Sequence, residues 1–288
     1  MSEPLLKSLQ CLGPAGLHRM AYWEWGQRDN PRVLVCVHGL ARQGRDFDAL
    51  ARRLSAQYRV ICPDVVGRGR SDWLANPAHY QIPNYVADMV SLLARLDVEQ
   101  VDWVGTSMGG LIGLGLAALP GSPVRRLVLN DVGPSIRYEA LQRIGSYLGQ
   151  PVEFETAEQG AAYLQGISQG FGPHSAEQWL ALSRPMFRAV DGKLRLHYDP
   201  RIAVPFAAVT PELAAAGEAA LWAAYDHLRC EALLLRGADS DLLSRETAEA
   251  MTQRGPRATL HELPGVGHAP TLVAAEQIAL VEGFLNKA

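Results

Sequence analysis

A serine stands at the centre of the segment GTSMG, residues 105–109, which has the spacing G-x-S-x-G. Residues 101–104 before it, which are apolar apart from Asp102, predict a buried strand, and residues 110–119 after it predict a helix with many small residues. A serine on a tight turn between a strand and a helix holds its hydroxyl clear of the sheet, where it can attack a carbonyl group. Because G-x-S-x-G also occurs by chance, a nucleophilic role for Ser107 depends on the rest of the chain.

A histidine near the end of the chain is the candidate base for Ser107. A serine hydroxyl is a weak nucleophile near neutral pH, so it needs a base within hydrogen-bond distance. His268 follows a predicted last strand at residues 259–263 and precedes a predicted helix that begins at about Thr271. Glycine and proline in the intervening loop can bend the imidazole back over the carboxyl edge of the sheet.

The imidazole in turn needs a carboxylate that fixes its tautomer, and three aspartates are candidates. Asp241 is favoured because its loop leaves the carboxyl end of the predicted strand 232–235, where open α/β sheets bind their ligands. Asp239 lies in the same loop, and Asp131 lies at the end of the predicted strand 127–129. Each choice gives the chain order serine, aspartate, histidine.

Two backbone N–H groups are candidates for binding the negative oxygen that forms when a serine attacks a carbonyl. One belongs to Met108, the residue after the serine, and the other belongs to Leu40, in the loop after the predicted strand 33–37. His38 in this loop is expected to shape the turn and not to act as a base. One such donor stabilises a transition state by roughly 3–4 kcal/mol.

Short apolar runs alternate with helical patterns and predict a doubly wound α/β fold with a mostly parallel sheet. The runs are continuous, which is typical of strands buried on both faces. They comprise residues 33–37, 59–62, 101–104, 127–129 and 232–235. Residues 46–57 and 84–96 have apolar residues at helical spacing, and residues 17–26 are expected to join an early antiparallel hairpin.

The alternation stops between Gly133 and Asp226, where aromatic residues accompany helical patterns and no strand-like run appears. The sequence therefore predicts a core of residues 1–132 and 227–288, with an inserted helical cap at residues 133–226 that covers an apolar pocket. The candidate pocket residues are His38, Tyr147, Phe171, Trp179, Phe187 and Arg188. Arg188, or its neighbour Arg184, would bind a substrate carboxylate if it faced the pocket.

The composition is that of an ordinary soluble globular protein, with 288 residues, 48% apolar residues and 20% charged residues. A net charge of −3 gives no electrostatic reason to expect nucleic acid or a membrane as a partner. The four cysteines form no C-x-x-C pair, which argues against a disulfide framework and a zinc site. No signal-peptide core or apolar stretch of ~18 residues appears. We therefore expect a cytoplasmic monomer or homodimer.

Four motifs in chain order together resemble the α/β-hydrolase superfamily over nearly the whole chain. They are His38-Gly39, PDVVGRGRS at residues 63–71, GTSMG at residues 105–109, and Gly267-His268. The second is similar to the family turn P-D-x-x-G-x-G-x-S, in which Asp64 would have a structural role. The resemblance is to a serine carboxylesterase-like branch, and the family commonly carries a helical cap where the insertion is predicted.

This resemblance implies a serine hydrolase that acts on a small, largely apolar carboxylic ester and needs no metal or organic cofactor. Haloalkane dehalogenases and epoxide hydrolases of the superfamily use aspartate as the nucleophile, so Ser107 argues against both. Two alternatives remain open. One is a carbon–carbon bond hydrolase of meta-cleavage type, and the other is a slow-turnover ligand receptor that retains the triad.

Overall fold

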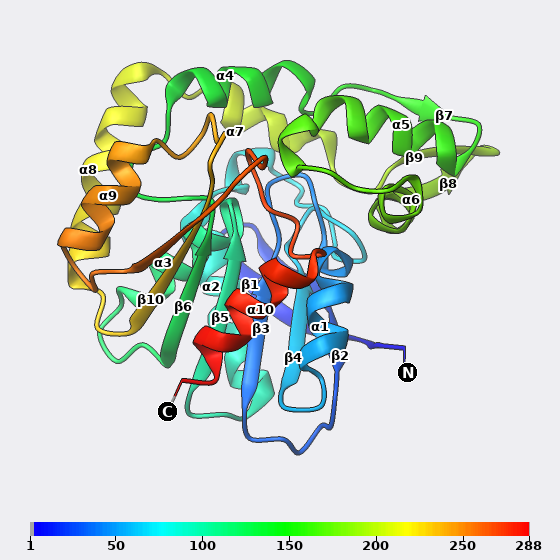
Figure 1. The fold of residues 1–288 in the computed structure, drawn as a ribbon. Coiled ribbons are helices and arrows are strands. Elements are labelled where there is room, and N and C mark those ends of the chain that lie inside the picture. The colour runs from blue at the N-terminus through cyan, green and yellow to red at the C-terminus, as the bar shows by residue number, and fades with distance from the viewer. Residues whose placement is uncertain (1–2, 288) are drawn as a thin grey trace.

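A mixed sheet of eight strands forms the centre of the computed structural model, which describes residues 3–287 (Figure 1). In spatial order the strands are β1 (Leu5–Gly13), β2 (Gly16–Trp25), β4 (Arg59–Asp64), β3 (Val33–Val37), β5 (Val101–Thr106), β6 (Val124–Asn130), β10 (Glu231–Gly237) and β11 (Thr259–Leu263). The strands from β4 to β11 in this order run parallel, and the β1–β2 hairpin adds two antiparallel strands at one edge. The doubly wound α/β fold with a mostly parallel sheet is confirmed.

Helices cover both faces of this sheet and bury an apolar cluster on each (Figure 1). One face carries α1 (Asp48–Leu54) and α10 (Ala275–Leu285), and the other carries α2 (Ile82–Leu96), α3 (Met108–Ala117), α8 (Pro211–His227) and α9 (Arg245–Gln253). Every residue of β3 and β4 is buried, which is why these strands read as continuous apolar runs. Within residues 3–287, no helix combines the length and the apolar character that a membrane span requires.

The strands and helices predicted for the core are present, with some shifts in their ends. β3 and β11 have the predicted bounds, whereas β4, β5, β6 and β10 extend further. The helix predicted at residues 46–57 is a short 3-10 helix, Gly44–Phe47, followed by α1, and another 3-10 helix spans Pro77–His79. The last helix begins at Ala275 because Leu272 has a φ of 57°, which a right-handed helix cannot include.

Residues 133–226 lie between β6 and β10, mostly over the carboxyl ends of the parallel strands (Figure 1). Before α8, they form α4 (Tyr138–Tyr147), β7 (Glu153–Phe154), α5 (Ala157–Ile167), α6 (Ala176–Ser183), β8 (Phe187–Val190), β9 (Lys193–Leu196) and α7 (Ala203–Ala207), with 3-10 helices at Gln169–Phe171, Arg184–Met186 and Pro200–Ile202. The boundaries of the core and the cap stay a prediction, and Met1, Ser2 and Ala288 of the predicted core lie outside the described residues.

The prediction that this segment contains no strand is wrong, because β7, β9 and β8 form a second, three-stranded sheet. β8 and β9 are four residues long and are joined through Asp191 and Gly192, which both have positive φ. Their charged side chains alternate with apolar ones, so they form no continuous apolar run.

A buried group of polar side chains holds the β1–β2 hairpin against α2. His18 Nε2 lies 3.0 Å from the Asp88 carboxylate, and this hydrogen bond raises the pKa of His18 above its usual value. The Cys11 thiol joins the group, whose potential metal-ligand atoms lie within 4.8 Å of one another. The four cysteines, Cys11, Cys36, Cys62 and Cys230, are free thiols.

Gly113 lets α3 pack directly on β5, because a Cβ at this position would overlap the indole of Trp103. We expect Gly113→Ala to lower the free energy of unfolding by about 1–3 kcal/mol, the usual cost of forcing a methyl group into a packed core.

The matched control is Gly217 in α8, which is exposed and has no atom within 4 Å of a Cβ built there. Gly217→Ala should stabilise the protein by about 0.5–1 kcal/mol, because alanine loses less backbone entropy in a helix. Urea unfolding measures both effects, and equal effects would contradict this account of α3.

Candidate active site

Ser107 lies at a sharp turn between β5 and α3, with a φ of 52° and a ψ of −117°. A positive φ is unfavourable for a residue with a Cβ, so close packing must hold this turn in place. Glycine is required on both sides of the serine. A Cβ at Gly105 would overlap the backbone of Gly109, and a Cβ at Gly109 would overlap the Val37 carbonyl at the end of β3. The serine turn is therefore wedged between its own strand and the neighbouring one.

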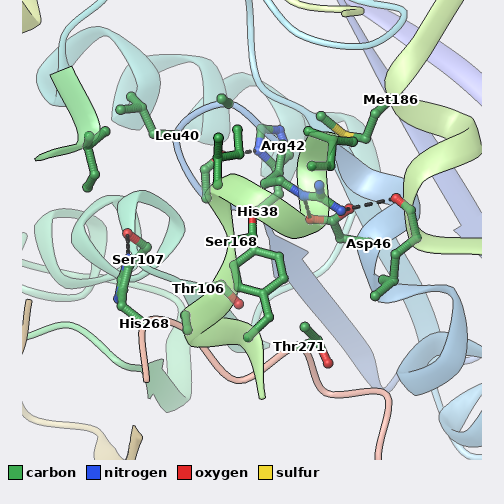
Figure 2. A pocket seen from close by; sticks show the side chains of 18 of the residues that line it. His38, Leu40, Arg42, Asp46, Thr106, Ser107, Ser168, Met186, His268 and Thr271 are labelled. Atoms are coloured by element: carbon green, nitrogen blue, oxygen red, sulfur yellow. Dashed lines mark hydrogen bonds and ion pairs between the residues drawn. The ribbon is translucent and has the colours of Figure 1, made fainter. Parts of the chain in front are cut away.

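Two hydrogen bonds link Ser107 to a buried carboxylate through His268. The Ser107 Oγ atom lies 3.0 Å from His268 Nε2 (Figure 2), and His268 Nδ1 lies 2.8 Å from Asp131 Oδ2. These residues come from the end of β5, the loop after β11 and the end of β6. Donation from Nδ1–H to the carboxylate leaves Nε2 as the acceptor for the serine proton, which is the arrangement that activates a hydroxyl nucleophile.

The Asp131 carboxylate is fully buried and accepts hydrogen bonds from two further groups. The Gly237 N–H donates to Oδ1 at 2.8 Å, and the Ser240 hydroxyl donates to Oδ2 at 2.6 Å. Both donors belong to the end of β10 and the loop that follows it. With His268, these donors fix the position of the carboxylate.

The preference for Asp241 over Asp131 as the partner of His268 is wrong. Asp241 forms an ion pair with Arg143 at 2.5 Å, and both side chains are more than 40% exposed. β6 lies directly beside β5, so the residue that follows β6, Asp131, reaches the histidine above Ser107. The end of β10 and the loop after it supply hydrogen-bond donors to the Asp131 carboxylate. Asp239, the other candidate in this loop, is exposed.

The predicted backbone donors Leu40 and Met108 lie on two turns that meet at the serine. Gly39 brings the Leu40 loop close, since a Cβ built on Gly39 would lie 3.8 Å from Ser107 Cβ. Within residues 3–287, no backbone or side-chain acceptor binds the N–H of either residue. Both N–H groups are therefore available to a ligand oxygen.

A buried arginine that the sequence analysis missed, Arg68, holds the Leu40 loop from behind. Its Nε donates to the Leu40 carbonyl at 2.8 Å, and its Nη2 lies 3.5 Å from Met108 Sδ. Its Nη1 donates to the Val66 carbonyl and the Tyr85 hydroxyl. The side chain is fully buried, and no carboxylate of the described residues forms an ion pair with it. Its position in the motif PDVVGRGRS was visible in the sequence, but the direction of its side chain was not.

His38 has hydrogen bonds on both ring nitrogens and shapes the turn after β3, as expected. Nδ1–H donates to the Gly39 carbonyl at 2.7 Å, and Nε2 accepts from the Val65 N–H at 3.0 Å. Burial lowers the pKa of His38 to about 3, so the ring is neutral, as this pair of hydrogen bonds requires.

A cavity lies over Ser107 and His268, between the sheet and the segment 133–226 (Figure 2). Its wall is mostly aliphatic and aromatic, and three of the predicted pocket residues, His38, Tyr147 and Phe171, line it. Trp179 lies behind Phe171, with the two rings stacked at 5.9 Å between centroids. Trp179 thus supports the wall without lining the cavity.

The prediction that Phe187 and Arg188 line the cavity is wrong. Arg184 does not line it either. Phe187 packs on Phe154 at 5.6 Å between ring centroids, inside the segment 133–226. Arg188 lies with its guanidinium carbon 4.6 Å from the centre of the Trp73 ring. Both belong to β8, the strand that the sequence did not reveal.

Two charged residues that the sequence analysis did not single out, Arg42 and Asp46, also line the cavity. Arg42 Nε and Nη2 donate to the two carboxylate oxygens of Asp46 at 2.7 and 2.8 Å (Figure 2). Their position shortly after Leu40 was the one hint in the sequence that they lie near the site. The sequence alone did not indicate that their side chains face a cavity.

The segment 133–226 touches the histidine loop at Gly170. The Gly267 N–H donates to the Gly170 carbonyl at 2.7 Å, and a Cβ at Gly170 would lie 2.8 Å from the His268 carbonyl. The same 3-10 helix carries Phe171, which lines the cavity. The cavity wall and the loop that positions His268 are therefore in direct contact.

The family model for the Alpha/beta hydrolase family matches residues 34–280. The chain belongs to the alpha/beta hydrolase family. It is 57% identical to a 3-hydroxybutyrate-oligomer hydrolase of Cupriavidus necator, with 100% of this chain and 99% of the relative covered. It is 30% identical to a 2-hydroxy-6-oxo-2,4-heptadienoate hydrolase of Pseudomonas putida, with 89% of each covered. The crystal structure of an alpha/beta hydrolase from Novosphingobium aromaticivorans has a TM-score of 0.87 at 37% identity, with 100% of both chains covered.

The buried neutral His38 should make this alpha/beta hydrolase less stable in acid. The unfolded chain takes up a proton on His38 near an ordinary pKa of about 6.5, whereas burial lowers the pKa to about 3 in the folded protein. The free energy of unfolding should therefore lose about 1.4 kcal/mol per pH unit from this residue as the pH falls below ~6. His38→Asn should make the pH dependence shallower by this amount between pH 6 and 4. Urea unfolding at a series of pH values tests this, and parallel curves for the two proteins would contradict it.

Proposed function

We propose that the chain is a serine hydrolase that cleaves the ester bonds of short 3-hydroxybutyrate oligomers through an acyl-enzyme on Ser107. One observation carries the reaction type: Ser107, His268 and Asp131 form a hydrogen-bonded chain at the wall of an apolar cavity. The substrate class is supported by the relative that is 57% identical over the whole chain, a 3-hydroxybutyrate-oligomer hydrolase.

In the first half of the proposed reaction, Ser107 Oγ attacks the ester carbonyl carbon while His268 Nε2 takes up the hydroxyl proton. The carbonyl π electrons move onto the oxygen, which the N–H groups of Leu40 and Met108 stabilise. Asp131 stabilises the imidazolium and keeps the ring in place. When the tetrahedral intermediate collapses, the carbonyl re-forms, the bond to the alcohol oxygen breaks, and this oxygen takes the proton from His268.

In the second half, a water molecule attacks the acyl-enzyme, and His268 takes up one of its protons. The same two N–H groups stabilise the second negative oxygen. Collapse breaks the bond to Ser107 Oγ, which recovers its proton from His268, and releases the hydroxy acid. No metal or organic cofactor enters this balance.

Arg68 has a positioning role in this proposal. It holds the Leu40 carbonyl through Nε, so it sets the direction in which the Leu40 N–H points. Its buried positive charge also lies beside Met108, which carries the second donor. A buried cation behind both donors favours negative charge on the oxygen in front of them, because the surrounding medium screens it weakly.

The charges around the cavity favour an ester over a ring-cleavage dienoate. The cationic side chains that line it are each paired with a carboxylate, Arg42 with Asp46 and Arg143 with Asp241. A dienoate substrate would need an unpaired cation for its carboxylate inside the cavity. A 3-hydroxybutyrate chain presents neutral esters and methyl groups to the apolar wall, although a dienoate hydrolase is also among the relatives.

The choice between the two aspartates gives a sharp test of the triad. Asp131→Asn should lower kcat for p-nitrophenyl butyrate by about 10³–10⁴-fold, because the amide cannot hold the imidazole in the required tautomer. Asp241→Asn is the matched control and should change kcat by no more than about twofold, since an exposed ion pair contributes little. Steady-state kinetics measures both, with Ser107→Ala as the background. A larger loss in Asp241→Asn than in Asp131→Asn would refute this triad.

A substrate comparison separates the proposal from its two alternatives. The 3-hydroxybutyrate trimer should be hydrolysed over many turnovers, with a kcat/KM at least about 100-fold above that for a ring-cleavage dienoate. Chromatography of released 3-hydroxybutyrate and the loss of dienoate absorbance measure the two rates. Faster consumption of the dienoate would identify a carbon–carbon bond hydrolase. One stoichiometric burst followed by very slow release would identify a receptor.

A further inference from the structure

We propose that Arg42 and Asp46 form a subsite that binds the free hydroxyl end of a hydroxyacyl chain whose ester is cleaved at Ser107. The subsite rests on the proposed ester hydrolysis and adds the direction in which the substrate lies. Its basis is an ion pair, only 12% and 20% exposed, in the wall of a cavity that is otherwise largely apolar. Charged groups in such a wall are costly unless they have a polar partner, so they mark the place where a polar part of the substrate would bind.

The subsite lies within reach of a chain attached to Ser107. A Cβ built on Gly39 would lie 3.8 Å from Arg42 Cγ and 3.8 Å from Ser107 Cβ, so the arginine stem and the nucleophile flank the same glycine. The guanidinium then extends away from this glycine toward Asp46 (Figure 2). In the same view, the pair lies across the cavity from Ser107 and His268. An acyl group on the serine can therefore extend along the cavity toward the pair.

The ion pair leaves defined hydrogen-bonding positions open. Arg42 Nε and Nη2 are used by Asp46, and Nη2 also donates to the Leu182 carbonyl at 3.1 Å. Nη1 has no partner in the part of the chain that the structure describes, and each Asp46 oxygen has accepted only one hydrogen bond and keeps a second lone pair. The guanidinium carbon also lies over the Phe171 ring, 5.6 Å from its centre. The pair thus offers a donor and an acceptor side by side.

A hydroxyl group fits this subsite, and a carboxylate does not. The charges of Arg42 and Asp46 cancel, so a hydroxyl can donate to Asp46 and accept from Nη1 without adding charge. A carboxylate would place a second negative charge beside Asp46 in a weakly screened environment. Burial raises the pKa of Asp46, because a weakly polar environment disfavours negative charge at this place.

The two ends of a 3-hydroxybutyrate oligomer differ in the property that the subsite distinguishes. One end is a free hydroxyl, the other is a carboxylate, and the units between them have only ester groups. With the hydroxyl at Arg42 and Asp46, the carboxylate end extends to the opposite side of Ser107. Arg143 also lines the cavity and is 41% exposed, so part of the cavity wall reaches solvent. The enzyme would then shorten the chain from its hydroxyl end.

Three trimers of 3-hydroxybutyrate test this subsite: the free trimer, the trimer acetylated on its terminal hydroxyl, and the trimer methylated on its terminal carboxylate. Acetylation should lower the kcat/KM of the wild-type enzyme by at least about tenfold, because it removes a hydrogen bond to a charged group. Methylation should lower it by less than about threefold, because the carboxylate stays near solvent. Mass spectrometry of the products identifies the end that is released first.

Substitutions of the pair should abolish this discrimination. Arg42→Met and Asp46→Asn should each bring the ratio of kcat/KM for the free and acetylated trimers from at least about tenfold to within about threefold. Arg45 and Asp48 form a matched control pair, joined by hydrogen bonds of 2.6–2.9 Å and not lining the cavity. Arg45→Met should keep the wild-type ratio.

The outcomes separate this subsite from the proposed function. Equal rates for the free and acetylated trimers, with p-nitrophenyl butyrate still hydrolysed, would overturn the subsite and leave ester hydrolysis intact. A larger penalty from methylation than from acetylation would also overturn it, since it would place the carboxylate end at the ion pair. Loss of discrimination in Arg45→Met as well would assign the effect to the fold of this region. If neither p-nitrophenyl butyrate nor any trimer were hydrolysed, the proposed function itself would fall.

Discussion

The buried Asp131 carboxylate joins three loops at the carboxyl edge of the sheet, and the geometry around Ser107 depends on it. It directly follows β6, and its partners are His268 after β11, Gly237 at the end of β10 and Ser240 in the loop after β10. A buried carboxylate is unfavourable unless such donors surround it, and removing a partner of a buried charge costs about 3–5 kcal/mol. The loops must therefore come together as one unit, and their meeting point places the imidazole over the serine.

The need of buried polar groups for hydrogen-bond partners also explains the other polar groups of the site. Arg68 is buried without a carboxylate, and backbone carbonyls and a tyrosine hydroxyl satisfy its N–H groups instead. His38 is buried as a neutral ring with a partner on each nitrogen. Arg42 and Asp46 satisfy each other and still face the cavity. Each group is fixed in direction, which is what an active site needs to act on a charge that develops at a defined point.

Much of this arrangement could be predicted because the relevant signals are local. The apolar runs of β3, β5 and β10, the glycines around Ser107 and the loop before His268 each depend on neighbours in the chain. Contacts between distant segments were harder to predict. Phe187 and Arg188 were misplaced because β8 is short and half-exposed, so it lacks an apolar run. Arg68 and Arg42 were missed because an arginine in a loop has the same sequence pattern whether it faces solvent or a cavity.

The sequence by itself determined the fold class and the serine turn, and it singled out His268 and the N–H groups of Leu40 and Met108 as candidates, since strand periodicity, glycine spacing and chain order are properties of short segments. It also reduced the candidates for the carboxylate partner of His268 to three aspartates. Only the tertiary structure decided among them, because the choice depends on β6 lying next to β5 and on which loop turns its carboxylate inward. The composition of the cavity wall also depends on the tertiary structure. The wall is made where residues 133–226 meet the loops after β3 and β11, and a contact between segments far apart in the chain has no signature in either segment alone.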